Sequence, residues 1–186
     1  MDRHAARPFQ LDRPHFGYGS NMWPPWLWFD ADVRSARARP TPAKIRGYRL
    51  AFSKLSTRDR SAKANVVPRA RNVVWGVLFD IDPSDIRALN RKEGVDYEPK
   101  PIIVRDAQGV PTLAWWYQAF TKPCREWPCR WYVDLALRGA TLFELPASYR
   151  RTLKAQRAKH CEDDDRAQAA AAALDSDPSA PPSWPS

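Results

Sequence analysis

The sequence contains few cysteines and no long apolar run, and these absences argue against a membrane-spanning, a secreted or a disulfide-rich protein. No apolar stretch among the 186 residues approaches the ~20 that a membrane-spanning helix needs. The basic first residues are not followed by an apolar segment, so we expect no secretory signal and no membrane partner. Three cysteines, Cys124, Cys129 and Cys161, are sparse and odd in number, which favours reduced thiols over a disulfide framework. We therefore expect a cytoplasmic protein.

Several chemical motifs are missing as well. The glycine-containing stretch FGYGSN at residues 16–21 lacks the spacing of both nucleotide-binding glycine loops, so we expect no nucleotide cofactor. Cys124 and Cys129 have no second pair that would complete a tetrahedral metal site. The chain also shows no Ser/His/Asp or Cys/His arrangement, which argues against a protein nucleophile. The expected cofactor and metal content is none.

The charge is unevenly distributed. The net charge is +9, and from Glu162 onward there are six acidic residues and one base, so the rest of the chain is strongly basic. This positive charge indicates either that the protein binds nucleic acid or that arginine side chains simply solvate its surface. A nucleic-acid-binding module is thus the alternative of another class, although we do not favour it. It would use the bases Arg58, Arg60, Lys63, Arg69 and Arg71.

Composition divides the chain into three parts. Residues 1–14 are predicted to be a flexible arm, and residues 15–160 a single domain with enough apolar residues for one core. Residues 161–186 are acidic and then rich in alanine and proline, so we expect a tail that is disordered or only partly helical.

Within the domain, short strands alternate with short helices. Residues 45–53, 64–68 and 73–81 read as strands, and residues 101–106 and 110–120 as a hairpin that turns at Gly109. A helix is predicted from the N-cap Asp82 to Glu93, with Gly94 as its stop, and further helices within 127–140 and over 146–160. Between the first two strands we expect a polar, basic loop. The order indicates an α+β fold with a small, curved or closed antiparallel sheet.

The order of several short motifs is more specific than any of them alone. Phe16–Met22 reads FGYGSNM, Ala64–Pro68 reads ANVVP and Val73–Ile81 reads VVWGVLFDI. Leu89–Val95 reads LNRKEGV, and Trp131–Tyr149 combines Tyr132, a Gly-Ala pair, a Leu-Pro pair and a final tyrosine. In this order the chain resembles the γ-glutamylcyclotransferase family. The resemblance covers roughly residues 15–155.

The resemblance implies a small mixed or antiparallel β-barrel flanked by short helices. It also implies an enzyme that cyclises a γ-glutamyl amide to 5-oxoproline and releases an amine or amino acid. Glu93 would be the general base and acid of this reaction. The turn of Tyr18, Gly19, Ser20 and Asn21 would bind the substrate through its backbone N–H groups, and Tyr132 would contact the glutamyl moiety.

The resemblance leaves the leaving group and the assembly open. The alternatives are a general γ-glutamyl amino acid enzyme, a γ-glutamylamine enzyme and one that removes a protecting group in a specialised pathway. The glutathione-degrading branch has a different residue where this chain has Asn21, so it ranks below the general one. Where the family has a polar helix, this chain has WPPWLWF. Its aromatics Trp23, Trp26, Trp28 and Phe29 either line an apolar leaving-group pocket or pack over the barrel. We expect a small-molecule partner and a monomer or homodimer.

Overall fold

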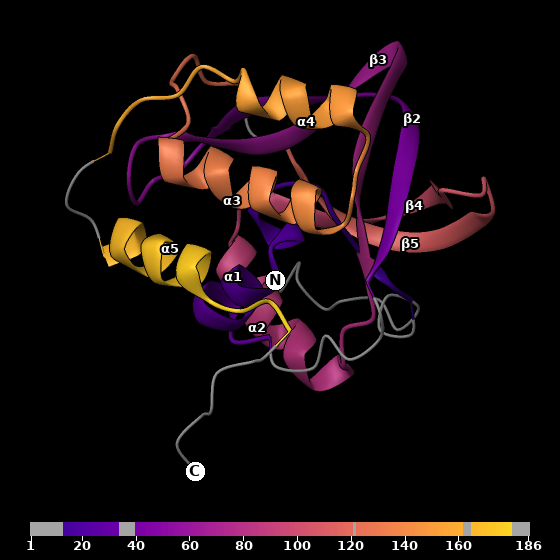
Figure 1. Cartoon of the computed structure of the whole chain (residues 1–186), viewed down its shortest axis with the longest axis horizontal. Helices are drawn as coiled ribbons and strands as arrows, with labels where there is room; N and C mark the ends of the chain where they lie inside the picture. The colour runs from indigo at the N-terminus through magenta and orange to yellow at the C-terminus, as the bar shows by residue number, and fades with distance from the viewer. Residues whose placement is uncertain (1–12, 34–39, 121, 162–164, 180–186) are drawn as a thin grey trace.

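The computed structural model describes residues 13–33, 40–120, 122–161 and 165–179. Its centre is a closed barrel with the strand order β1-β3-β2-β4-β5, in which β5 pairs with β1 to close the ring. The expected α+β fold with a small barrel is therefore confirmed (Figure 1). The strands are β1 (His15–Gly17), β2 (Thr41–Leu55), β3 (Ala62–Phe79), β4 (Tyr97–Asp106) and β5 (Pro111–Ala119).

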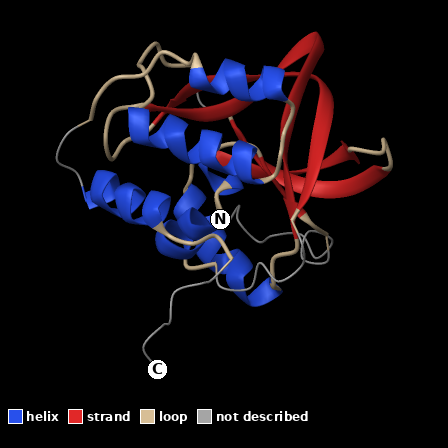
Figure 2. Ribbon diagram, in the orientation of Figure 1, coloured by secondary structure: helices blue, strands red, loops and turns tan. Residues whose placement is uncertain are grey.

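The helices gather on one side of the barrel (Figure 2). Helix α3 packs against the 3-10 helix η2 and against α4 and α5, and α5 also packs against α1. In the described part of the chain, no helix is long and apolar enough to cross a membrane. The helices are η2 (Ser20–Met22), α1 (Pro24–Ala31), α2 (Pro83–Glu93), α3 (Arg130–Leu142), α4 (Ala147–Lys154) and α5 (Asp165–Asp175).

The two strands expected at 64–68 and 73–81 are one long strand, β3. It pairs antiparallel with β2, and the register shifts between Arg46 and Tyr48, where a bulge absorbs the extra residues of β3. The expected polar loop between β2 and β3 is shorter than predicted. Lys54 and Lys63 lie within the strands and are only 8% and 6% exposed, because both amines have acidic partners.

Local sequence signals predicted α2 and the β4–β5 hairpin correctly. The Asp82 side chain accepts a hydrogen bond from the Ser84 N–H at 2.9 Å, and Glu93 is the last residue of the helix. Gly109 lies in the turn between β4 and β5 with φ of +86°, a conformation that suits glycine. Helix α4 ends at Lys154, earlier than the expected run to residue 160.

The Gly-Ala pair of α3 lets this helix approach η2 closely. A Cβ on Gly139 would lie 2.5 Å from the backbone of Met22, so no larger residue fits without moving η2. Since η2 directly follows Gly19, this contact fixes the turn that the sequence singled out. Gly139 is therefore a packing residue that supports the Gly19 turn through the contact of α3 with η2.

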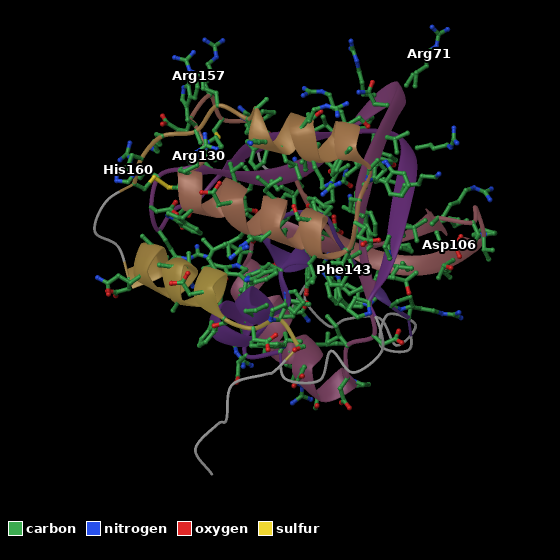
Figure 3. The ribbon with its side chains drawn as sticks, in the orientation of Figure 1. Arg71, Asp106, Arg130, Phe143, Arg157 and His160 are labelled. Carbon is green, nitrogen blue, oxygen red and sulfur yellow. A yellow bond between two sulfur atoms is a disulfide. The ribbon has the colours of Figure 1, made fainter. Side chains whose placement is uncertain are left out.

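One expectation about the C-terminal part is wrong. Cys129 and Cys161 form a disulfide, so these thiols are not free, and only Cys124 is a free cysteine (Figure 3). The pattern of three sparse cysteines gave no sign of this pairing because the partners are 32 residues apart. The support that reduced thiols gave to a cytoplasmic location is removed, and that location stays a prediction.

The tail, which we expected to be disordered or only partly helical, is helical over residues 165–175, which form α5. The helix buries Ala170 and Ala173, and the Trp23 indole Nε1–H donates to the carbonyl of Ala173 at 2.7 Å. Residues 1–12, 162–164 and 180–186, where the arm and the rest of the tail were expected, lie outside the described residues.

The aromatic run is mostly core. Trp23, Trp26 and Trp28 are buried in or beside α1, whereas Phe29 is 42% exposed. None of these four residues lines the cavity described below. Of the two expectations for this run, packing over the barrel is the one that the structure supports.

Candidate active site

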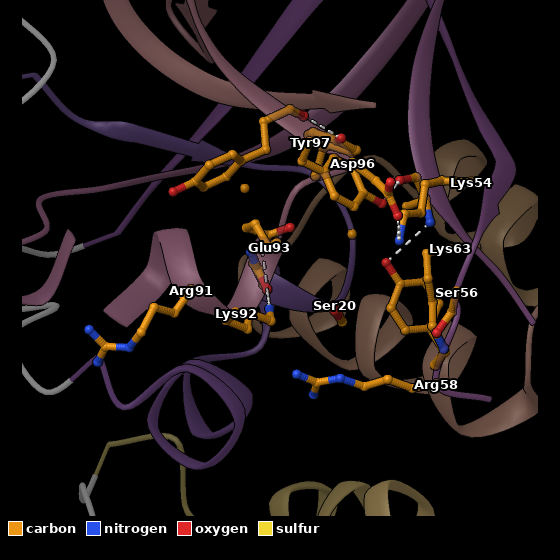
Figure 4. Close-up of a pocket in the computed structure, with 18 of the residues that line it drawn as sticks. Ser20, Lys54, Ser56, Arg58, Lys63, Arg91, Lys92, Glu93, Asp96 and Tyr97 are labelled. Atoms are coloured by element: carbon orange, nitrogen blue, oxygen red, sulfur yellow. Dashed lines mark hydrogen bonds and ion pairs between the residues drawn. The ribbon is translucent and has the colours of Figure 1, made fainter. Parts of the chain in front are cut away.

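A cavity of about 270 Å³ opens beside the end of the barrel where η2, α2 and the β2–β3 connection meet (Figure 4). Its wall combines polar groups from segments that are far apart in the sequence. Every residue that the sequence predicted for the site lines it: Tyr18, Gly19, Ser20, Asn21, Glu93 and Tyr132. The fold thus brings the predicted site residues together, while their roles are not established by position alone.

Glu93 lies at the C-terminal end of α2 with its side chain 11% exposed. One carboxylate oxygen, Oε1, accepts a hydrogen bond from the Asn21 amide Nδ2 at 2.8 Å and lies 3.4 Å from the Lys92 Nζ. The other oxygen, Oε2, has no partner among the described residues. The carboxylate is therefore held in one orientation with half of its hydrogen-bonding capacity left for a ligand.

Lys92 connects Glu93 to two further residues. Its Nζ donates to Asn21 Oδ1 and lies 3.6 Å from Asp30 Oδ2. Both oxygens of Asp30 accept from one nitrogen of Arg166, each at 3.1 Å. Positive and negative charges thus alternate from Arg166 through Asp30 and Lys92 to Glu93, and α5 supplies the outermost one.

The turn at Gly19 faces Tyr132 at close range. A Cβ on Gly19 would lie 3.0 Å from the Ala64 Cβ and 3.1 Å from the Tyr132 hydroxyl, so any side chain there would push these neighbours back by a few tenths of an ångström. The N–H groups of Ser20 and Asn21 donate to no backbone carbonyl within the described residues. Two backbone donors are therefore available beside the Glu93 carboxylate, which is a suitable arrangement for an anionic oxygen.

Four buried tyrosines surround the carboxylate. Burial raises the pKa of Tyr132 to about 12, and burial also raises the pKa values of Tyr18, Tyr97 and Tyr117, with the charge of Glu93 contributing in each case. The Tyr18 hydroxyl donates to the Tyr117 carbonyl at 2.5 Å. The Tyr132 hydroxyl accepts from the Ala64 N–H at 3.2 Å. These hydroxyls stay protonated at neutral pH and donate or accept hydrogen bonds without taking a charge.

Some of the cationic side chains that line the cavity have an acidic partner and others do not. Lys54 forms an ion pair with Asp96 at 3.0 Å, and Lys63 with Asp59 at 2.5 Å. Arg58 and Arg91 also line the cavity, but both are exposed and neither has an acidic partner among the described residues. The inner wall is therefore close to neutral, and the uncompensated positive charge lies at the rim.

The basic side chains that the nucleic-acid hypothesis would use do not form one exposed group. Lys63 is buried against Asp59 and is not available to a macromolecule. Arg60, Arg69 and Arg71 are exposed, and Arg71 projects from β3 away from the body (Figure 3). Within the described residues there is no group of three His, Cys, Asp or Glu side chains placed to hold a metal ion.

Three residues around the site were not predicted from the sequence: Asp30, Lys92 and Arg166. Lys92 directly precedes Glu93, so its place beside the site had a signal in the same motif. Arg166 was visible only as the single base in an acidic tail. Its contact with Asp30 spans 136 positions of sequence, and nothing in a local pattern indicates it.

Comparison with known proteins supports the resemblance that the motifs indicated. Residues 73–153 match the model of the AIG2-like family, a segment that includes Glu93 and Tyr132 but neither the Tyr18–Asn21 turn nor Arg166. A comparison with curated protein sequences finds no match.

Solved structures share the fold. A γ-glutamyl cyclotransferase superposes with a TM-score of 0.72 at 22% identity, covering 84% of this chain and 95% of that one. The human uncharacterized protein loc79017 gives a TM-score of 0.73 at 22% identity with the same coverage. A yeast γ-glutamyl cyclotransferase specific to glutathione gives 0.50 at 14% identity, covering 87% and 95%. At these identities the likeness establishes the fold, and the chemistry must be argued from the site.

Proposed function

We propose that this chain is a γ-glutamylcyclotransferase-type enzyme that converts a γ-glutamyl amide into 5-oxoproline and releases the amine of that amide. The observation that carries the proposal is the Glu93 carboxylate. It is nearly buried, oriented through Oε1 by Asn21, and without a partner on Oε2 among the described residues. The AIG2-like match and the fold shared with γ-glutamyl cyclotransferases support it.

The reaction needs a proton carrier and no protein nucleophile. The substrate's α-amino nitrogen attacks its own γ-carbonyl carbon, a new C–N bond closes the five-membered ring, and the bond to the leaving nitrogen breaks. Because both reacting groups belong to one molecule, much of the entropic cost is already met. The α-ammonium nitrogen loses two protons in becoming the lactam N–H, and the leaving nitrogen gains two in departing as an ammonium group. Glu93 takes protons from the first nitrogen and gives them to the second. One carboxylate serves both steps in turn.

The turn beside Glu93 would stabilise the negative charge that develops on the substrate during attack. The γ-carbonyl oxygen becomes an anion in the tetrahedral intermediate, and donors that are already oriented stabilise it. The N–H groups of Ser20 and Asn21 are available for this oxygen or for the substrate's α-carboxylate. Tyr132 lies next to them, its hydroxyl accepting a hydrogen bond from the Ala64 N–H, and would contact the glutamyl moiety.

The charges at the rim favour one class of leaving group. Arg58 and Arg91 line the cavity without acidic partners among the described residues, so a carboxylate on the leaving group is attracted there. A γ-glutamyl amino acid or peptide has such a carboxylate, whereas a γ-glutamylamine does not. The aromatic run does not line the cavity, so a bulky apolar protecting group has no support from it.

The test is a mass-spectrometric assay for 5-oxoproline with γ-glutamyl dipeptides, γ-glutamyl amines and glutathione as substrates. We expect product with the wild-type protein and a loss of at least 100-fold in kcat for Glu93→Gln, since positioned proton transfer contributes about 10²–10⁴-fold. Glu98→Gln is the control, because Glu98 is an exposed glutamate that pairs with Lys100 outside the cavity. A folded wild-type protein that yields no 5-oxoproline from any substrate would refute the proposal.

The alternative of another class is tested in the same preparation. A nucleic-acid-binding module would bind a random oligonucleotide with an affinity that falls steeply with salt and that depends on Arg60, Arg69 and Arg71. Binding that survives Glu93→Gln while cyclisation does not would assign the two properties to separate surfaces. We expect weak binding, because Lys63 is buried.

A further inference from the structure

Helix α5 contributes a residue to the cavity wall although it comes from the acidic end of the chain. Arg166 lines the same cavity as Glu93 and is 21% exposed, compared with 10% for the carboxylate of Asp30 that it contacts. Its guanidinium also lies over the rings of Trp26 and Trp131, at 5.6 Å and 5.7 Å. These rings hold the guanidinium between α1 and α3, where it reaches Asp30.

Asp30 connects Arg166 to the residues around Glu93. Its Oδ2 lies 3.1 Å from Arg166 and 3.6 Å from the Lys92 Nζ, so the carboxylate is shared between two cations. The Lys92 Nζ is shared in turn between Asp30, Asn21 Oδ1 and Glu93 Oε1. Charges within such distances in a partly dry environment interact strongly, so the position of each depends on its neighbours.

We infer that Arg166 is a positioning residue for Glu93, acting through Asp30 and Lys92, so that α5 belongs to the catalytic unit. This inference rests on the proposed function of Glu93. Without Arg166, Asp30 has Lys92 as its remaining cationic partner and draws its Nζ away from Glu93 and Asn21. The hydrogen bond from Asn21 to Glu93 then loses the amine that holds the Asn21 carbonyl oxygen.

The structure offers a matched control. Arg138, on α3, donates to the Leu174 carbonyl at the end of α5 at 3.0 Å and lies 5.7 Å from the Trp23 ring. It therefore holds α5 in the same manner as Arg166, an arginine over a tryptophan, but it has no contact with Asp30 and does not line the cavity. Its removal takes away one attachment of α5 to α3 and leaves the contacts of Arg166 with Asp30, Trp26 and Trp131 in place.

The experiment compares Arg166→Met, Arg166→Lys and Arg138→Met in the full chain. We expect Arg166→Met to lower kcat for 5-oxoproline formation at least tenfold with KM within about twofold of wild type. Arg166→Lys should recover part of the loss, and Arg138→Met should leave both constants unchanged. A rise in KM alone would make Arg166 a substrate-binding residue, and equal effects of the two Met variants would make it structural, so either result overturns the inference.

A second measurement does not depend on turnover. The side-chain NH₂ signal of Asn21 in a ¹⁵N-labelled protein, assigned by its loss in Asn21→Asp, reports the contact with Glu93. We expect it to shift in Arg166→Met and to stay in place in Arg138→Met. If the wild-type protein forms no 5-oxoproline, the proposed function fails, and this signal still decides whether Arg166 is coupled to Glu93. An unchanged signal in Arg166→Met would refute the coupling.

Discussion

Asn21 donates a hydrogen bond to Glu93 across 72 positions of sequence, with 2.8 Å between Nδ2 and Oε1. The sequence motifs assigned a backbone role to Asn21, whereas the structure uses its side chain to orient the carboxylate. The same amide accepts from Lys92 through Oδ1. Both ends of the amide are therefore committed, and the residue links the η2 turn to the end of α2.

Removing this amide should reduce activity more than stability. Asn21→Leu keeps the approximate volume and removes both hydrogen bonds. Hydrogen bonds to charged groups contribute about 1.5–3 kcal/mol, so we expect kcat/KM for 5-oxoproline formation to fall by roughly 10–100-fold. Steady-state kinetics and a thermal unfolding curve together test this prediction. A variant with unchanged kinetics would show that Glu93 is oriented by other groups.

A side chain at Gly19 should destabilise the fold. In Gly19→Ala the new Cβ lies 3.1 Å from the Tyr132 hydroxyl and 3.0 Å from the Ala64 Cβ, and overpacking costs about 1–3 kcal/mol. We expect this loss in the free energy of unfolding, measured in urea. In a Tyr132→Phe background one of the two close contacts is absent, so the same substitution should cost less. Equal costs in both backgrounds would contradict the contact.

The disulfide should stabilise the fold through the segment it closes. Cys129 and Cys161 are 32 residues apart, and a closed loop of this length contributes on the order of 3 kcal/mol. We expect Cys161→Ser to lower the free energy of unfolding by about 2–4 kcal/mol. Cys124→Ser is the control, since Cys124 is free and half-buried. Thiol titration of the purified protein should count one reactive group; three would mean that the bond is absent.

Features of the fold that depend on neighbouring residues were predictable from the sequence, whereas features that depend on distant residues were not. Helix α2 was predictable to the residue because Asp82, Pro83 and Gly94 determine its ends within a few positions. Strand β3 was predicted in two pieces, because Pro68 and the exposed stretch after it resemble a break. In the structure the pairing with β2 continues beyond them after a bulge, which no local pattern indicates.

The site shows the same division. Tyr18, Gly19, Ser20, Asn21, Glu93 and Tyr132 were identified from motif order, and the cavity contains all six. The partners of these residues were not identified. Asp30 directly follows the aromatic run and Arg166 lies in the acidic tail, so their meeting depends on how α1 and α5 pack. Such pairings follow from three-dimensional packing, which a single sequence does not specify.

A buried histidine should make the fold sensitive to acid. Burial, together with the nearby charge of Lys92, lowers the pKa of His15 from 6.5 to about 3. The neutral form is favoured in the folded state, so this contribution to stability is complete above pH about 6.5 and is lost as the pH falls towards 3. The slope for one proton is at most about 1.4 kcal/mol per pH unit.

Asp59 is a second group whose protonation destabilises the fold in acid, and it acts at a lower pH than His15. Burial alone would raise its pKa, but the hydrogen bond and charge of Lys63 outweigh burial and lower it to about 2. Its contribution is therefore lost only below pH about 4, underneath most of the His15 range. His15→Phe keeps a ring against Trp115, whose centroid lies 4.5 Å away. Its unfolding free energy should be flatter than that of wild type between pH 7 and 4.5, and parallel curves would contradict the assignment.

Arg58 should select substrates by the charge of the leaving group. It is exposed, it lines the cavity, and it has no acidic partner among the described residues, so replacing it leaves no buried carboxylate unpaired. We expect Arg58→Ala to raise KM several-fold for a γ-glutamyl amino acid, since an exposed charge pair contributes at most about 1 kcal/mol. For a γ-glutamylamine of similar size, KM should stay unchanged. The exposed Arg69 lies outside the cavity, and Arg69→Ala removes the same charge as a control. An equal effect of Arg58→Ala on both substrates would mean that Arg58 does not contact the leaving group's carboxylate.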